Sequence, residues 1–87
     1  MIEWVEDKAG DDVQYSYAVL SSLVELHCHH NPVSGWLGYV DLPNKRLTLY
    51  ADTLEAIKTK TIKEARRYLI KLHTDFTTAL NKIGDGL

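Results

Sequence analysis

The sequence predicts an α+β fold, in which an antiparallel meander sheet of four to five strands carries one long C-terminal helix packed across it. Over residues 1–51, apolar and polar residues alternate in short stretches separated by turn-forming residues, which is the pattern of half-buried strands. Over residues 52–83, apolar residues recur every three or four positions, which is the pattern of an amphipathic helix. Short loops between successive strands favour pairing in chain order.

Length and composition are those of one small globular unit. The 87 residues allow a single domain, with the sheet in residues 1–51, the helix in residues 52–83 and a frayed tail in residues 84–87. A chain of this size buries only about 60–65% of its surface on folding, so a partner would add to its stability. The hydrophobic fraction of 45% and the charged fraction of 25% are ordinary for a folded protein.

The cellular setting is predicted from what the sequence contains near its start and from its cysteine. Cys28 is the single cysteine, which excludes an internal disulfide and fits a reducing compartment. The longest apolar runs fall well short of the about 20 residues that span a membrane. Residues 1–6 have neither the basic segment nor the apolar core of a signal peptide. We therefore expect a cytoplasmic protein that does not associate with membranes.

The first two strands are predicted on either side of a polar turn. Residues 1–6 are expected to form a short strand through Ile2, Trp4 and Val5, and residues 7–12 a turn centred on Gly10. A second strand follows from strict alternation after residue 12. Its aromatic and β-branched residues, on one face, are Val13, Tyr15, Tyr17 and Val19.

The remaining strands are also predicted from alternation and from turn residues. Val24, Leu26 and Cys28 alternate with polar residues and indicate a third strand. A fourth strand is expected over residues 36–42 and a fifth over residues 46–51, joined by a tight turn at residues 43–44. One alternative is a helix over residues 13–30, which contain neither glycine nor proline. We favour strands there because β-branched and aromatic residues are frequent and the two-residue period is cleaner.

The helix has the most regular pattern in the chain. Its apolar stripe consists of Ile62, Ala65, Leu69, Leu72, Phe76, Ala79 and Ile83. Asp52 and Glu55 predict a capping box at its start, and Gly84 a left-handed cap at its end. The stripe changes phase near residues 58–61, so either Thr61 joins the stripe or the helix bends there.

The helix is expected to be too long for the sheet. At 1.5 Å per residue it measures about 45 Å, which exceeds the width of five strands at about 4.8 Å each. The turns carrying Phe76, Ala79 and Ile83 would then extend beyond the sheet. Because an apolar stripe is costly to leave in water, this predicts a homodimer or another protein partner. The expected contact residues are Trp36 and Tyr39 on the sheet and Ile70, Phe76 and Ile83 on the helix.

The charge distribution supports an alternative function. The net charge is −2, but residues 1–52 carry −5 and residues 53–87 carry +3. The cations of the helix are Lys58, Lys60, Lys63, Arg66, Arg67 and Lys71. Phosphates attract such a group, so the basic face of the helix is a candidate nucleic-acid surface. The acidic side chains between them and the acidic balance of the chain favour a merely solvated face instead.

Histidines and the cysteine cluster at residues 27–30. His27 and His29 would share one face of a strand, at a spacing that suits two ligands of one metal ion. A third ligand would have to come from Glu25, His30 or His73, and no second ligand pair is recognisable. We therefore expect solvated histidines and no metal, with a pH-sensitive contact as a further alternative.

Catalytic motifs are not recognisable in the chain. Cys28 would face away from its histidine neighbours in a strand, so they cannot activate it as a nucleophile. The sequence contains neither a glycine-rich phosphate loop nor a serine elbow. We therefore expect a non-enzymatic protein without a cofactor.

Two stretches resemble a pattern of small phage and prophage proteins, in which a Gly-Trp strand and a following strand lead into a capped helix. They are Ser34-Gly35-Trp36-Leu37-Gly38-Tyr39-Val40 and Tyr50-Ala51-Asp52-Thr53-Leu54-Glu55-Ala56. This resemblance implies an interaction protein of phage or mobile-element type, and some proteins of this build inhibit host defence systems by binding them.

A second likeness is to the arm-binding domain of tyrosine recombinases, a three-stranded sheet followed by a helix. In that family the sheet is basic and reads DNA. Here the strand region is acidic, with only Lys45 and Arg46 at its last turn, and this departure argues against DNA reading by the sheet.

Overall fold

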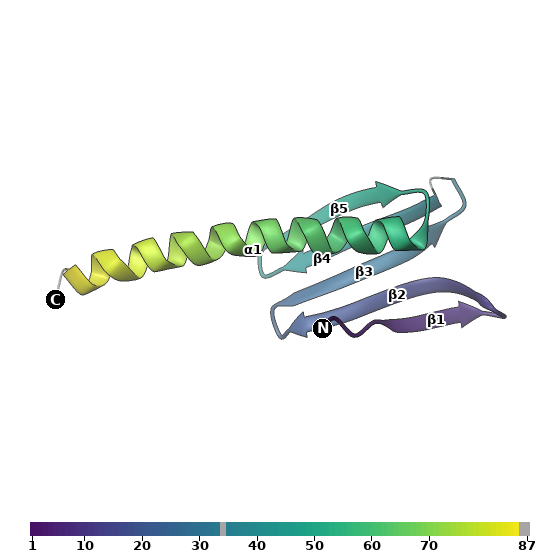
Figure 1. Cartoon of the computed structure of the whole chain (residues 1–87), viewed down its shortest axis with the longest axis horizontal. Coiled ribbons are helices and arrows are strands. Elements are labelled where there is room, and N and C mark those ends of the chain that lie inside the picture. The colour runs from purple at the N-terminus through teal and green to yellow at the C-terminus, as the bar shows by residue number, and fades with distance from the viewer. Residues whose placement is uncertain (34, 86–87) are drawn as a thin grey trace.

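The computed structural model describes residues 1–33 and 35–85. The elements in chain order are β1 (Val5–Ala9), β2 (Asp12–Ser21), β3 (Val24–Asn31), β4 (Gly35–Leu42), β5 (Lys45–Ala51) and α1 (Leu54–Asp85). The strands form one sheet in the order β1-β2-β3-β4-β5, and each neighbouring pair is antiparallel (Figure 1). The predicted α+β meander with a long C-terminal helix is therefore confirmed, and residues 13–30 form strands.

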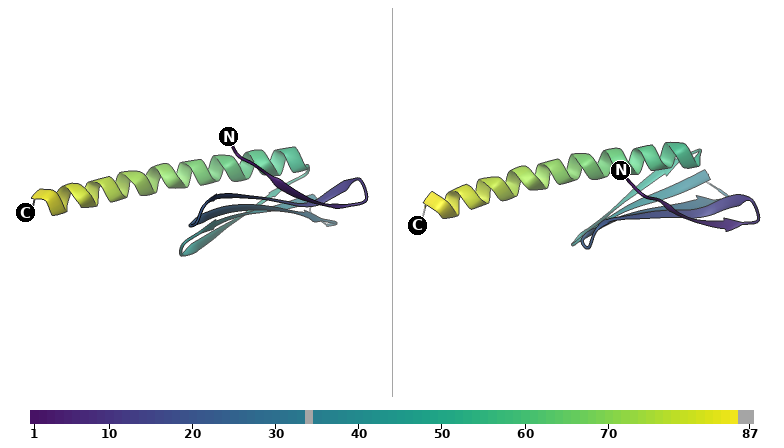
Figure 2. Two further views of the ribbon diagram at one scale, coloured as in Figure 1. Left: turned by 90° about the horizontal axis from the view of Figure 1, so that it is seen from below. Right: turned by 60° about the horizontal axis from the view of Figure 1, so that its bottom comes forward.

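The helix covers only part of one face of the sheet. It contacts β3, β4 and β5, while β1 and β2 lie to one side of it (Figures 1 and 2). The chain before β1 returns toward α1, and Ile2 and Trp4 pack against the core there. The core lies mainly between α1 and β3–β5, and its largest fully buried side chains are Leu26, Val40, Ile57 and Thr61.

Gly38 in β4 sets how closely the helix approaches the sheet. A Cβ atom at this position would lie 2.7 Å from Thr61 Cγ2 and 2.8 Å from Ile57 Cδ1, well inside normal contact distance. Thr61 is fully buried, and its hydroxyl donates a hydrogen bond to the Lys58 carbonyl, 2.9 Å away. Thr61 therefore joins the buried stripe, which settles the alternative left open at residues 58–61.

The start of α1 differs from the predicted capping box. The helix begins at Leu54, and Thr53 is the capping residue: its hydroxyl accepts a hydrogen bond of 3.1 Å from the Ala56 backbone N–H. The prediction of Asp52 and Glu55 as a capping pair is wrong by one residue. The Thr53 carbonyl accepts a second hydrogen bond of 3.0 Å, from the Ile57 backbone N–H.

The end of α1 also differs from the prediction. The helix runs through Gly84 to Asp85, and Gly84 does not adopt the positive φ of a left-handed cap. Nothing packs within 4 Å of a Cβ at Gly84, so no tertiary contact turns the chain there. Residues 84–85 of the predicted tail are thus helical, and residues 86–87 lie outside the described residues.

The first strand is shifted relative to its prediction. The predicted strand at residues 1–6 and turn at residues 7–12 are replaced by β1 and a short turn in which Gly10 has a φ of 66°. Asp7 pairs with Tyr15, and the register then shifts between Asp7 and Lys8. A charged run forms a strand here because β1 is an edge strand with all of its side chains exposed.

The helix extends far beyond the sheet, as predicted, but in a different direction. Figures 1 and 2 show α1 running lengthwise over the strands, so it passes their ends and not the edge of the sheet. The comparison of helix length with sheet width therefore gave the right outcome for the wrong geometric reason. The molecule measures 60 × 21 × 21 Å as a consequence.

Candidate interaction surface

The apolar stripe of α1 follows a seven-residue repeat. Ile62, Leu69, Phe76 and Ile83 are spaced by seven residues, and Ala65, Leu72 and Ala79 follow the first three of them by three residues. These are the a and d positions of a heptad, the pattern with which one helix packs along another. We call the part of the helix at residues 54–72 the sheet-covered half and the part at residues 73–84 the overhang.

The two parts differ sharply in burial. In the sheet-covered half Ala65 is only 2% exposed, and Leu69 and Leu72 are half-buried. In the overhang Phe76 is 63% exposed and Ile83 is 62% exposed. Leu80, beside the stripe, is 66% exposed. The overhang therefore presents large apolar side chains to solvent beyond the end of the sheet.

A small apolar hollow lies where the sheet ends under the helix. It has a volume of about 270 Å³, and Leu72 and Phe76 of α1 form one wall. Leu23 and Pro43, in the turns that follow β2 and β4, form the other wall together with Leu42. Leu23 is itself 62% exposed. The hollow is thus continuous with the apolar stripe of the overhang.

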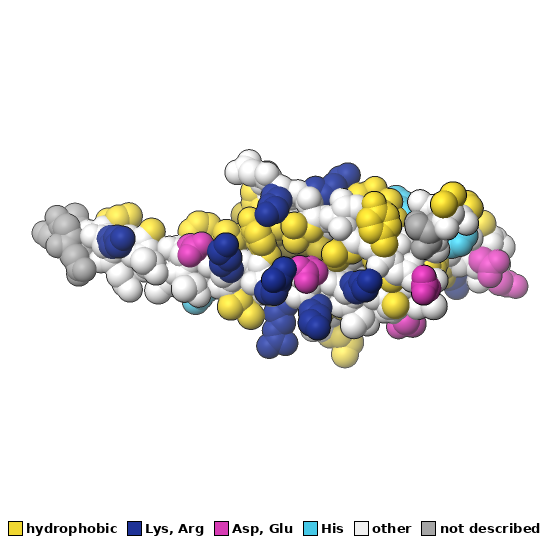
Figure 3. Space-filling view, turned by 90° about the horizontal axis from the view of Figure 1, so that it is seen from above, with side chains coloured by type: hydrophobic (Ala, Val, Ile, Leu, Met, Phe, Trp, Pro, Cys, Tyr) yellow, Lys and Arg dark blue, Asp and Glu magenta, His cyan; other side chains and the backbone are white. Residues whose placement is uncertain are grey.

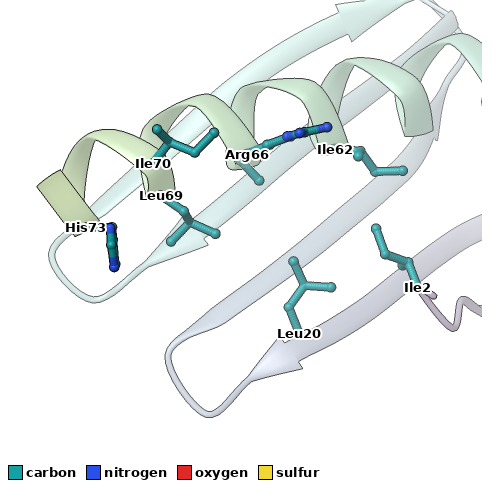
Figure 4. Close-up of a pocket in the computed structure, with 8 residues that line it drawn as sticks. Ile2, Leu20, Ile62, Arg66, Leu69, Ile70 and His73 are labelled. Atoms are coloured by element: carbon teal, nitrogen blue, oxygen red, sulfur yellow. The ribbon is translucent and has the colours of Figure 1, made fainter.

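A second, larger groove of about 540 Å³ lies between α1 and β2 (Figure 4). Leu20 and Ile2 face Ile62 and Leu69 across it, and Ile70 also lines it. Arg66 and His73 lie at its margin, as Figure 4 shows. The groove exists because α1 sits over β3–β5 and leaves the helix side of β2 partly uncovered.

The five predicted contact residues do not form one surface. Phe76 and Ile83 share the overhang stripe, whereas Ile70, 57% exposed, lies at the groove. Trp36 is only 8% exposed and packs with Ile57 in the core. Tyr39 is half-buried on the opposite face of the sheet. Only Phe76 and Ile83 of the five are therefore brought together on one exposed surface.

Leu80, Leu23 and Pro43 are part of this surface but were not predicted. Leu80 carries a local signal, because it lies four residues after Phe76 and three before Ile83. Leu23 and Pro43 carry none, because they join the overhang only where two turns of the sheet come beneath the helix.

The cations of α1 are not equally available to a ligand. Lys58 lies inward with its side chain 14% exposed, and its Nζ is 3.0 Å from Glu6 Oε1 and 5.1 Å from the centre of the Trp4 ring. Lys60 Nζ donates to the Tyr50 carbonyl at 2.6 Å, and Arg67 pairs with Glu64 at 2.8 Å.

The other three predicted cations, Lys63, Arg66 and Lys71, are exposed, as are Lys60 and the paired Arg67, whose side chain is 78% exposed. Figure 3 shows the basic side chains along α1 with acidic ones between them and apolar side chains on either side.

The Glu6 carboxyl responds to Lys58. Burial alone would raise the pKa of Glu6, but hydrogen bonds from Lys58 and Ser16 and the positive charges of Lys58 and Lys8 together lower it. The pair joins the edge strand β1 to the helix and therefore has a structural role.

The predicted histidine face is an ordered polar network. His27 and His29 share the face of the sheet opposite α1, as predicted. The His27 ring bonds the Tyr15 hydroxyl through Nδ1, and its Nε2 lies 3.0 Å from Glu25 Oε1. Asp41 Oδ2 lies 3.4 Å from the same Nε2. Among the described residues, no group of three or more His, Cys, Asp or Glu side chains is arranged to hold a metal ion.

Arg46 also belongs to this network, because it pairs with Asp41. Its guanidinium donates to both oxygens of Asp41, at 2.5 and 3.2 Å, and lies 4.6 Å from the centre of the Tyr39 ring. Burial lowers the pKa of His29, and the neighbouring charges of His27 and Arg46 lower it further. This face is thus a set of mutually satisfied groups, with Tyr39 partly covered by Arg46.

Cys28 is separated from these histidines by the sheet itself. Its side chain is fully buried under α1, and burial raises the pKa of the thiol from 9.0 to about 11. A thiol in that state is neutral at physiological pH and is a weak nucleophile.

Comparisons with known proteins identified no match to this chain. No family model, curated protein or solved structure matches the chain. Within the part of the chain that the structure describes, no helix is both long enough and apolar enough to cross a membrane.

Proposed function

We propose that this protein is a non-enzymatic interaction module that binds another protein chain through the overhang of α1. One observation carries the proposal. The apolar stripe continues beyond the end of the sheet, and Phe76, Leu80 and Ile83 are each more than 60% exposed there. Full burial of one such side chain contributes about 1.5–3 kcal/mol, so a partner that covers all three would gain several kcal/mol.

The charge of the overhang supports a protein partner. Asp75 and Lys82 are its only acidic and basic residues apart from His73, so residues 73–84 carry no net formal charge. A surface of this kind gains little from long-range attraction to a polyanion and depends on contact and shape. The exposed cations lie earlier on the helix, up to Lys71.

The proposal is tested by photo-crosslinking in cells that produce the protein. Leu80 is replaced with benzoylphenylalanine, and a matched variant carries the same group at Thr59, which is exposed on the outer side of the sheet-covered half. We expect a defined protein adduct from position 80, of the chain with itself or with another protein, and none from position 59. Equal labelling from both positions, or no adduct from position 80, would overturn the proposal.

Nucleic acid is the second candidate partner, and the exposed set Lys63, Arg66 and Lys71 on α1 favours it. Fluorescence anisotropy of a labelled duplex and a labelled single strand, at low and at physiological salt, provides the test. Binding that weakens steeply with salt, and is lost when Lys63, Arg66 and Lys71 are replaced with glutamine, would support this candidate. Absence of binding at both salt concentrations would exclude the nucleic-acid candidate.

The phage-type origin and the inhibition of a host system stay predictions from sequence resemblance. They concern the identity of the partner, and the overhang is the surface that we propose for it.

A further inference from the structure

We infer that the overhang pairs with the overhang of a second copy of this chain, with the two helices antiparallel. This inference rests on the proposed function and names the partner. It is carried by the position of the sheet, by the order of large and small side chains and by the two charges of the overhang.

The position of the sheet decides the orientation. The stripe of the overhang faces the same side of α1 as the sheet, since it continues the a and d positions of residues 62–72, where Ala65 is buried. A parallel partner would have to place its own residues 54–72 where the sheet already lies. An antiparallel partner occupies only the space beside residues 73–84, beyond the ends of the strands (Figure 2). Its own sheet then lies past the C-terminal end of the first helix.

The side chains of the overhang complement each other in that orientation. In an antiparallel pair, a positions of one helix face d positions of the other. Phe76 then lies opposite the partner's Ala79, and the symmetric contact repeats it. Leu72 lies opposite the partner's Ile83. Each layer therefore combines a large with a small side chain, or two of medium size, which is the arrangement that fills space without overlap.

The hollow at the end of the sheet receives the tip of the partner helix. In the same register, the partner's Ile83 comes beside Leu72 and Phe76, which form one wall of the hollow. Leu23 and Pro43 form the wall on the sheet side. The overhang spans about 18 Å at 1.5 Å per residue. When the two overhangs lie side by side over this length, the C-terminal end of each helix reaches the sheet of the other chain.

The two charges of the overhang select the same register. Asp75 and Lys82 each directly precede an a position, so they flank the stripe on one side. In the antiparallel register Asp75 lies beside the partner's Lys82, and symmetry makes this pair twice. In a parallel pair Asp75 would lie beside the partner's Leu80, and no opposite charges would meet.

Sedimentation equilibrium with charge exchange provides the experiment. We expect the wild-type chain to form a dimer, and Asp75→Lys or Lys82→Asp alone to weaken it about tenfold, because each places two pairs of like charges together. The double variant Asp75→Lys, Lys82→Asp should restore the wild-type dissociation constant. A mixture of the two single variants should form a mixed dimer more stable than either homodimer.

Matched controls separate register from net charge. Asp11→Lys and Lys63→Asp make the same charge changes at exposed positions outside the overhang, and we expect each to leave the dissociation constant unchanged. A dimer that single and double exchanges weaken equally would overturn the antiparallel register. A wild-type chain that stays monomeric at several hundred micromolar would overturn self-pairing. An adduct from position 80 with a different protein would, in that case, retain the proposed function.

Discussion

The apolar stripe of α1 that begins at Ile62 passes from the sheet-covered half into the overhang, and its surroundings differ between the two. In the sheet-covered half the innermost side chains are Ile57, Thr61 and Ala65, all almost fully buried. In the overhang the stripe includes Phe76 and Ile83, both largely exposed. Periodicity therefore tells which side of a helix is apolar, whereas the extent of the sheet decides how much of that side is buried. Gly38 lets both Ile57 and Thr61 approach the backbone of β4, whereas Phe76 and Ile83 stay largely exposed.

The largest effect should distinguish the two halves directly. Ile57→Ala removes buried methyl groups and should lower the free energy of unfolding by about 2–5 kcal/mol. Ile83→Ala should change it by less than about 0.5 kcal/mol in dilute solution, because Ile83 is 62% exposed. Urea unfolding at low micromolar protein measures both values. Equal losses would show that the overhang is covered within one chain.

Gly38 provides the second test, because it sets the distance between helix and sheet. Gly38→Ala should cost about 1–3 kcal/mol, since the new Cβ would lie 2.7 Å from the Thr61 side chain. Gly84→Ala is the control in the overhang, where nothing lies within 4 Å, and it should be neutral or slightly stabilising. Thermal unfolding of both variants measures the difference. A neutral Gly38→Ala would mean that α1 can move away from β4 at little cost.

The buried thiol of Cys28 should make the free energy of unfolding depend on pH in the alkaline range. Its pKa is raised from 9.0 to about 11 in the folded chain, so between these values the unfolded chain has lost the proton and the folded chain keeps it. The free energy of unfolding should therefore fall as pH rises from 9 to 11, by an amount of order 2 kcal/mol. Cys28→Ala should flatten this part of the profile, measured by urea unfolding against pH. An unchanged slope would show that other groups, such as Tyr15, cause it.

The smallest effect should come from acid titration of the open face of the sheet. The pKa of His29 is lowered in the folded chain, so the unfolded chain binds the proton first as pH falls below the ordinary value of 6.5. The stability that neutral His29 contributes is present at higher pH and is lost as pH falls through this range. His29→Gln should reduce the slope, while Phe76→Ser in the overhang should leave it as in the wild type. A steeper slope in His29→Gln would contradict the assignment.

Most of the fold could be predicted because its signals are local. Alternation identified the strands at β2 to β5, and it placed Cys28 and His27 on opposite faces of β3. The errors lie where local signals compete or vanish. Asp52 and Thr53 are both good capping residues, and the charged edge strand β1 has no apolar alternation to reveal it. Part of the candidate interaction surface was also predictable, because Phe76 and Ile83 follow from spacing alone.

The sequence by itself determined which segments are strands and helix, their order, and which side of each is apolar, because these depend on repeat lengths that the backbone geometry imposes on neighbouring residues. Only the tertiary structure decided that α1 runs lengthwise over β3–β5, that Trp36 is buried, and that Leu23 and Pro43 lie beneath Phe76. These features depend on contacts between residues far apart in the chain, such as the contact of Thr61 with Gly38. Such contacts do not appear as a repeat in the sequence of either segment.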